Sequence, residues 1–179
     1  MSFAFCPRAR GVRTLSMPLR FATVLLNALA TADALDHAEA PDGPPWPPKG
    51  AKIRAARAAA LLAHFEGEED LEPSPTPKER ASYDSFCRSR DVWRATPSKD
   101  PNRVQGFKFG SNDGWIVSKE EAAIVAKALA EVLGDDSSLE LLRDILGVAR
   151  SENAALRASL EKFRAFNAKT AKGEGYGVF

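Results

Sequence analysis

The residues whose types and spacing could support chemistry are few, and they do not converge on one reaction. Asp33, Asp36 and His37 have the spacing that would place them on one face of a helix, and carboxylate and imidazole groups are common metal ligands. A metal site needs further ligands, and the sequence shows no obvious ones. We therefore interpret these three side chains as a solvated polar face and expect no metal site.

Catalytic motifs are also missing from the sequence. It contains no GxSxG, P-loop or HExxH pattern, and its two cysteines, Cys6 and Cys87, form neither a zinc pattern nor a disulfide framework. The acids occur as sequence neighbours, such as Glu120 with Glu121, rather than as a facing pair that would divide acid and base roles. We predict a protein that is not an enzyme, needs no cofactor and shows no sign of a small-molecule ligand. An enzyme that relies on its acids is the alternative.

One turn offers a candidate binding site. Asn112-Asp113-Gly114 is a strong turn sequence. Lys108, Asn112, Asp113 and Trp115 would gather a cation, polar groups and an indole ring around it. The competing interpretation, which we favour, is that these four residues only shape a β-hairpin.

A second candidate surface is the segment of residues 78–108, which holds eight basic and four acidic residues. Basic groups that contact phosphates and aromatic rings that stack on bases are typical of single-strand binding surfaces. Tyr83, Phe86 and Trp93 have helical spacing, however, and could be core residues, and the net charge of the chain is only +1. Nucleic-acid binding is therefore the second-ranked function, and it would use five arginines: Arg80, Arg88, Arg90, Arg94 and Arg103.

The elements around the turn can be predicted from local patterns. Residues 104–111 alternate in polarity, and the turn after them predicts a hairpin whose second strand is residues 115–117. A left-handed Gly114 in its loop would put four apolar residues on one face, which favours that register: Phe107, Phe109, Trp115 and Val117.

Helix signals follow the turn directly. Ser118 and Glu121 form a capping box, which predicts a helix over residues 119–133 and makes Glu121 a structural acid. Ser137 and Ser138 repeat the capping pattern before a longer helix. The end of the chain, residues 176–179, suits a final strand.

The acid-free, basic start of the chain admits two interpretations. The basic residues and the apolar run 21–30 resemble a targeting segment, so one alternative is a protein that is targeted to an organelle or exported through residues 1–30. Met17 could also be the true start. The favoured interpretation is an amphipathic helix with one apolar stripe: Phe21, Val24, Leu25, Ala28, Leu29, Ala32 and Leu35. Because the run is too short to span a bilayer, we predict no membrane span. The absence of a disulfide framework favours a reducing compartment, so we predict a cytoplasmic protein.

The chain as a whole is predicted to be α+β. A helical N-terminal half with proline-rich linkers would precede a C-terminal module made of a β-hairpin, a helix, a long helix and a strand. The predicted parts are a basic start with an amphipathic helix (1–40), a Pro-rich linker (41–50), a helical middle (51–103) with a second linker at 72–77, and the compact module (104–179).

The C-terminal part resembles a known group of sequences. The stretches "SNDGWIVSKEEAAIVAKAL" and "FRAFNAKTAKGEGYGVF" are similar to a module in small uncharacterised proteins of high-GC bacteria and their phages. In that module an NDGW turn leads into an acidic helix cap, and an aromatic strand ends the chain. The resemblance covers about residues 104–179 and implies no particular activity.

The predicted long helix carries an apolar seam that must be covered. Within residues 138–170 the seam positions are Leu139, Leu142, Leu146, Ala149, Asn153, Leu156, Leu160, Phe163 and Asn167. The preceding helix is only about 22 Å long against about 50 Å for the long one, so it is too short to cover the seam. Either Gly147 breaks the long helix, or N-terminal helices cover it, or another chain does. We therefore predict an accessory or regulatory protein that binds a protein partner, or itself as a homodimer, through residues 138–170.

Overall fold

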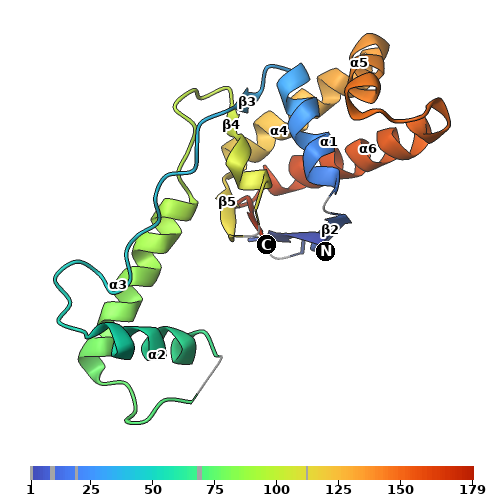
Figure 1. The fold of residues 1–179 in the computed structure, drawn as a ribbon. Coiled ribbons are helices and arrows are strands. Elements are labelled where there is room, and N and C mark those ends of the chain that lie inside the picture. Colours follow the sequence, from blue (N-terminus) through green and yellow to red (C-terminus); the bar gives the residue numbers. More distant parts are fainter. Residues whose placement is uncertain (1, 9–10, 19, 68–69, 112) are drawn as a thin grey trace. The chain divides into compact units, whose positions relative to one another are not determined.

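The computed structural model describes residues 2–8, 11–18, 20–67, 70–111 and 113–179 (Figure 1). It is an α+β protein, as the sequence predicts. Its contacts divide the chain into two compact units. Unit 1 combines residues 1–40 with residues 95–179, and unit 2 comprises residues 41–94.

Unit 1 is built on an antiparallel sheet with the strand order β2-β1-β6-β5. The strands are β1 (Ser2–Pro7), β2 (Leu15–Pro18), β5 (Trp115–Val117) and β6 (Tyr176–Val178). Phe3 lies opposite Met17 and Phe5 opposite Leu15, and all four side chains are buried. This alternation places one face of β1 and β2 in the core.

Four helices accompany this sheet: α1 (Arg20–Thr31), α4 (Lys119–Gly134), α5 (Asp136–Leu146) and α6 (Asn153–Thr170) (Figure 1). The apolar stripe predicted for α1 is confirmed for Phe21, Leu25, Ala28 and Leu29, which are buried, whereas its last positions, Ala32 and Leu35, lie beyond the end of the helix. The Phe163 ring of α6 lies 4.8 Å from that of Phe5 and 5.3 Å from that of Phe21, in edge-to-face contacts. Aromatic packing therefore joins α1 and α6 to the central strand β1.

The predicted β-hairpin at residues 104–117 is wrong. Phe107 and Phe109 lie in the 3-10 helix η1 (Gly106–Phe109), and β5 pairs with β6 instead of with its own sequence neighbours. Gly114 has the expected positive φ of 74°, and Phe109, Trp115 and Val117 are buried as expected. The apolar residues reach the core through a helical turn followed by a long-range strand pairing, which local alternation does not reveal.

The turn before β6 requires a glycine. Gly175 has a φ of 78°, and a Cβ atom there would clash with the carbonyl oxygen of Val117. The backbone can approach β5 this closely only without a side chain. The predicted final strand, with Tyr176 and Val178 buried, is confirmed.

The predicted long helix is broken at Gly147. This residue has a φ of 61° and ends α5, and the short 3-10 helix η2 (Arg150–Glu152) leads into α6. The serine cap expected at Ser137 is wrong. The N-cap of α5 is Asp135, two residues earlier, and its side chain accepts from the amides of Ser137 and Ser138. Because α4 packs along α6, most of the predicted seam is covered within unit 1, whereas Ala149 and Asn153 are exposed.

The compact unit is larger than the predicted module at residues 104–179. Strand β1 lies between β2 and β6, and β3 (Leu35–Asp36) pairs in parallel with β4 (Val104–Gln105). Ser98 Oγ donates to Asp36 Oδ2 at 2.7 Å beside this pair. Residues 1–40 therefore belong to the same core and are not a separate leading segment of the fold.

Unit 2 is a helix pair with its own small aromatic core. Its helices are α2 (Ala55–Phe65) and α3 (Pro77–Arg94). Trp46 packs on this core: its ring lies 5.3 Å from that of Phe86, and its Nε1 donates to the Ala58 carbonyl at 2.8 Å. Trp93 Nε1 donates to the Pro41 carbonyl at 2.8 Å, so the two ends of unit 2 are close together.

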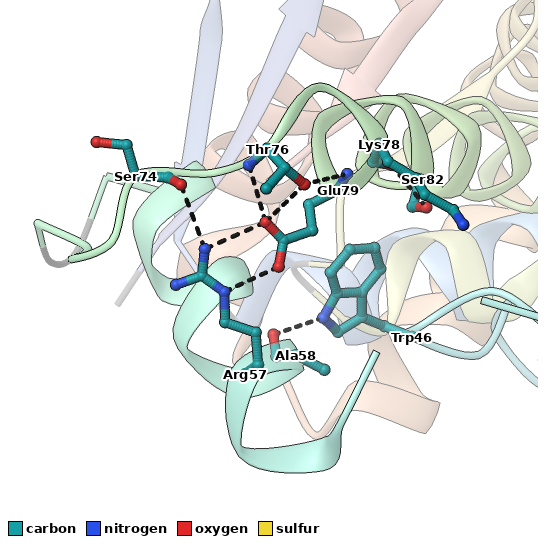
Figure 2. A network of polar contacts seen from close by, with 8 residues as sticks. All are labelled: Trp46, Arg57, Ala58, Ser74, Thr76, Lys78, Glu79 and Ser82. Atoms are coloured by element: carbon teal, nitrogen blue, oxygen red, sulfur yellow. Dashed lines mark hydrogen bonds and ion pairs between the residues drawn. The ribbon is translucent and has the colours of Figure 1, made fainter. Parts of the chain in front are cut away.

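A polar network fixes the start of α3 against α2 (Figure 2). Glu79 accepts from Arg57 Nε at 2.9 Å through Oε1, and its Oε2 accepts from Arg57 Nη2 and from Thr76. These hydrogen bonds, that from Arg57 first, lower the pKa of Glu79 from 4.5 to about 2. The carboxylate is therefore ionised throughout the neutral and mildly acidic range.

We first predict that residues 104–179 alone do not fold, because they lack β1 and α1. A chain with residues 41–94 replaced by a short Gly/Ser linker should fold, since the Ser98–Asp36 contact and the β3–β4 pairing hold the two stems together. Thermal unfolding followed by circular dichroism tests both chains. Cooperative unfolding of the 104–179 fragment would show that β1 is dispensable.

We next predict that Glu79 makes the stability of unit 2 sensitive to acid. Its folded pKa lies below the unfolded value, so its stabilising contribution is present above about pH 4.5 and is lost as the pH falls toward about 2. NMR signals of α2 and α3 should therefore report a steeper loss of unit 2 over this range in the wild type than in Glu79→Gln. Parallel pH curves for the two chains would contradict the assignment.

Candidate functional site

Lys108, the cation of the predicted turn site, is buried and is not available to a ligand. Its Nζ donates to Glu121 Oε1 at 2.7 Å, to Oε2 at 2.8 Å and to the Ile116 carbonyl at 2.9 Å. Burial lowers the pKa of Lys108, and the nearby Glu121 carboxylate opposes this shift. All three donors of the ammonium group are used, so the group is saturated by the protein itself.

Glu121 has the structural role that the sequence predicts for it. Its Oε2 accepts from the Ser118 amide at 2.9 Å, and its own amide donates to Ser118 Oγ at 3.2 Å, which completes the capping box of α4. The same carboxylate pairs with Lys108, so one acid serves the helix cap and the buried ion pair. The capping pattern was visible in the sequence, whereas the ion pair was not.

The other residues of the predicted turn site do not form an exposed cluster. Trp115 is only 1% exposed and its Nε1 donates to Ser111 Oγ at 2.9 Å, which in turn donates to Asp113 Oδ2 at 2.7 Å. Asp113 is exposed, and Asn112 lies outside the described residues. The indole is part of the core. Lys108 and Trp115 therefore have structural roles, as we favoured from the sequence, although they do not belong to a hairpin.

A second buried polar pair lies nearby. Tyr176 donates from its hydroxyl to Asn167 Oδ1 at 2.9 Å, and Asn167 Nδ2 donates to the Phe163 carbonyl at 2.9 Å. Burial, together with the charge of Glu121, raises the pKa of Tyr176 well above its usual value. The tyrosine is therefore neutral and acts as a hydrogen-bond donor inside the core.

The five arginines of the nucleic-acid alternative are divided between the two units. Arg103 lies in unit 1 and pairs with Asp33 at 2.7 Å, while the other four lie on α3 in unit 2. Arg90 pairs with Glu66 at 3.0 Å and lies over the Phe86 ring. Arg80 lies over the Phe65 ring. Arg94 is half-buried, and Arg88 is exposed.

The aromatic residues of that segment are also engaged by the protein. The rings of Tyr83 and Phe65 stack with centroids 4.4 Å apart, and Trp46 lies edge-on to Tyr83 at 5.7 Å. Rings that pack on one another are not free to stack on bases. This supports the core interpretation of the helical spacing and weakens the case for nucleic-acid binding.

Asp33, Asp36 and His37 do not share a helix face, because α1 ends at Thr31. Asp33 pairs with Arg103, and Asp36 accepts from Ser98 and from the Ala38 amide, which lowers the pKa of Asp36. His37 is exposed. Among the described residues, no three metal-ligating side chains of the His, Cys, Asp and Glu types come together.

The surface that sequence analysis missed lies on α5. Leu141 and Ile145 are each 53% exposed, one helical turn apart, although the adjacent Leu142 is fully buried. We call these two residues the α5 surface. A signal for it existed in the four-residue spacing of Leu141 and Ile145, but the 3–4 seam through Leu142 masked it.

Unit 1 also has a groove of about 510 Å³, and one of its lining residues is Leu146, which follows Ile145 in the sequence. Its apolar lining comes from α1, from the α5–α6 connection and from α6: Phe21, Val24, Leu146, Val148, Ala155 and Leu156. Arg20 and Glu152 add one charge of each sign to its lining. A concave apolar surface with a few polar groups is a suitable seat for an apolar side chain of a partner.

Comparisons of the chain with protein-family models, curated proteins and solved structures found no match. The resemblance of residues 104–179 to the bacterial and phage module therefore stays a prediction. No helix within the described residues is long and apolar enough to cross a membrane. A function has to follow from the geometry of this chain.

The buried ion pair yields a stability prediction. Lys108→Met leaves the Glu121 carboxylate buried without its cation and should destabilise the protein by about 3–5 kcal/mol. Lys108→Met combined with Glu121→Gln should recover more than half of this loss, because the glutamine is neutral and can still accept from the Ser118 amide. Chemical denaturation at neutral pH measures both values. A cost below about 1 kcal/mol for the single variant would show that the pair is not buried.

Proposed function

We propose that the protein is a non-enzymatic accessory protein that binds another protein through the α5 surface and the adjoining groove. The observation that carries this proposal is the exposure of Leu141 and Ile145 on a helix that packs into unit 1 through the buried Leu142. Among the described residues, the other exposed large hydrophobic side chains are Val92 and Phe179. Two neighbouring exposed aliphatic groups, on a helix whose last residue, Leu146, lines an apolar groove, are typical of an interaction surface.

The charges around α5 suggest the chemistry of the partner. Residues 135–146 hold four acids, Asp135, Asp136, Glu140 and Asp144, against one base, Arg143. Arg143 is paired with Asp144 at 2.7 Å, so acidic groups remain in excess beside the α5 surface. The best-fitting partner is a segment with large apolar side chains flanked by basic ones.

The same charges weigh against the homodimer that the seam suggested. Antiparallel packing of two copies of α5 on Leu141 and Ile145 would bring Glu140 and Asp144 of one copy toward the same acids of the other. Like charges at such an interface are unfavourable. A different protein is therefore the proposed partner, with a second copy of the chain as the alternative.

The proposal includes a cytoplasmic location. Cys6 and Cys87 are free thiols in the described structure, as expected in a reducing compartment. The alternative of export through residues 1–30 would require the loss of β1, β2 and most of α1 on cleavage. A processed chain would then lack the buried Phe3, Phe5 and Phe21.

The test compares partner capture by three chains. Leu141→Glu with Ile145→Glu should leave the fold intact, because both side chains are half exposed, and should weaken partner binding by at least about thirtyfold. Val92→Glu, at a residue 75% exposed in unit 2, is the matched control and should bind normally. Affinity capture from the source cell with quantitative mass spectrometry identifies proteins lost only with the α5 variant.

Light scattering at micromolar concentration complements the capture experiment. A monomer in all three chains agrees with a different protein as partner. A dimer that the α5 variant alone abolishes would identify a second copy as the partner instead. Identical capture by the wild type and the α5 variant would contradict the proposed surface.

A further inference from the structure

Unit 2 contains a pocket that is separate from the proposed protein-binding surface. It has a volume of about 330 Å³ and is formed by the segment before α2, the first turn of α2 and the start of α3. Four of its lining residues are cationic, namely Lys52, Arg54, Arg57 and Lys78. Glu79 is the one acidic residue among the described residues that line it.

Glu79 neutralises one of these four cations, Arg57. Its Oε1 accepts from Arg57 Nε, and its Oε2 accepts from Arg57 Nη2, from the Thr76 amide at 2.8 Å and from Thr76 Oγ1 at 2.9 Å (Figure 2). The carboxylate is thus held by Arg57 and Thr76. It leaves the other three positive charges of the pocket without compensation.

Those three cations are available to a ligand. Lys52, Arg54 and Lys78 are exposed, and none of them forms an ion pair within the described part of the chain. They come from two segments that are distant in sequence and meet only in the folded unit. A concave site with three unpaired cations attracts a compact, multiply charged anion.

The backbone around the pocket adds to this potential. The N-cap of α2 is Arg54, whose side chain makes no capping hydrogen bond, so the first amides of this helix lack a side-chain acceptor. The start of α3 differs, because Thr76 Oγ1 accepts from the Glu79 amide at 3.2 Å. The positive end of the α2 dipole is therefore left to interact with a bound anion.

We propose that this pocket binds the phosphate group of a phosphomonoester. A phosphomonoester carries about −1.5 to −2 charges at neutral pH, which suits three cations better than the single charge of a carboxylate. Lysine and arginine both bind phosphate, and the cavity leaves room for a part of the ester beyond the phosphate group. The ester is either a small metabolite or a phosphorylated side chain of a peptide.

The first test uses the full chain and inorganic phosphate as the probe. Two-dimensional NMR spectra are recorded at constant pH while phosphate replaces chloride at fixed ionic strength, which removes general salt effects. Saturable shifts are expected for the amides of residues 52–57 and 76–82. Shifts that do not saturate, or that spread over all basic parts of the chain, would overturn the proposal.

Variants show whether the pocket is responsible. Lys52→Ala with Lys78→Ala removes two of the unpaired cations and should weaken phosphate binding roughly tenfold. Arg88→Ala removes an exposed cation of α3 that does not line the pocket, so it should bind phosphate like the wild type. Equal affinity in all three chains, or equal weakening by both changes, would overturn the proposal.

Two further probes distinguish the sources of the phosphate group. A small sugar phosphate and a short phosphoserine peptide are titrated under the same conditions, with the unphosphorylated peptide as control. The probe that binds more tightly than inorganic phosphate, and loses that binding in the Lys52→Ala and Lys78→Ala variant, identifies the source. If neither exceeds inorganic phosphate, the pocket does not recognise an ester and the proposal fails.

Discussion

Antiparallel pairing between β1 and β6 is the interaction on which unit 1 depends. Phe5 lies opposite Val178 in this pair, and the Phe5 ring contacts Tyr176 at 5.9 Å and Phe163 at 4.8 Å. Because β1 and β6 are the two inner strands, β2 and β5 are attached to the sheet only through them. The rings of Phe163 and Phe166 on α6 contact Phe5 of β1 and Tyr176 of β6, so the sheet and the helices share one core.

Buried polar groups make this arrangement specific. Lys108 with Glu121 and Tyr176 with Asn167 lie in the interior, where each group costs free energy unless it has its partner. Lys108 also donates to the carbonyl of Ile116 on β5, so the ion pair ties η1, β5 and α4 to one another. A shifted strand register would separate these partners and leave buried polar groups without hydrogen bonds, which disfavours alternative pairings.

Sequence reasoning succeeded where neighbouring residues make the contact. The capping box of Ser118 and Glu121, the stripe that begins at Phe21 and the positive φ of Gly114 are all local features. It failed where the partner is far away in the sequence. Nothing near residues 2–7 indicates that β6 is their partner, and a lysine beside a turn resembles a surface cation until the distant Glu121 is placed beside it.

The same limit explains the outcome for the candidate sites. Leu141 and Ile145 could be recognised as exposed only after Gly147 had ended α5 and Leu142 had been assigned to the core. The pocket in unit 2 is lined by residues from 51–57 and from 76–82. Its net charge depends on which cation forms the ion pair with Glu79. Which residues are exposed and which charges form ion pairs depends on tertiary packing, so neither can be read from the sequence alone.

The closed ends of unit 2 have an energetic consequence for unit 1. Trp93 holds Pro41 within unit 2, while Ser98 holds Asp36 within unit 1, so the inserted segment leaves and returns at neighbouring points. An unfolded loop of roughly seventy residues between β3 and β4 would cost about 4 kcal/mol of closure entropy. Folding of unit 2 removes most of that loop freedom in advance. The two units can therefore stabilise each other through the shared chain, without any contact between their surfaces.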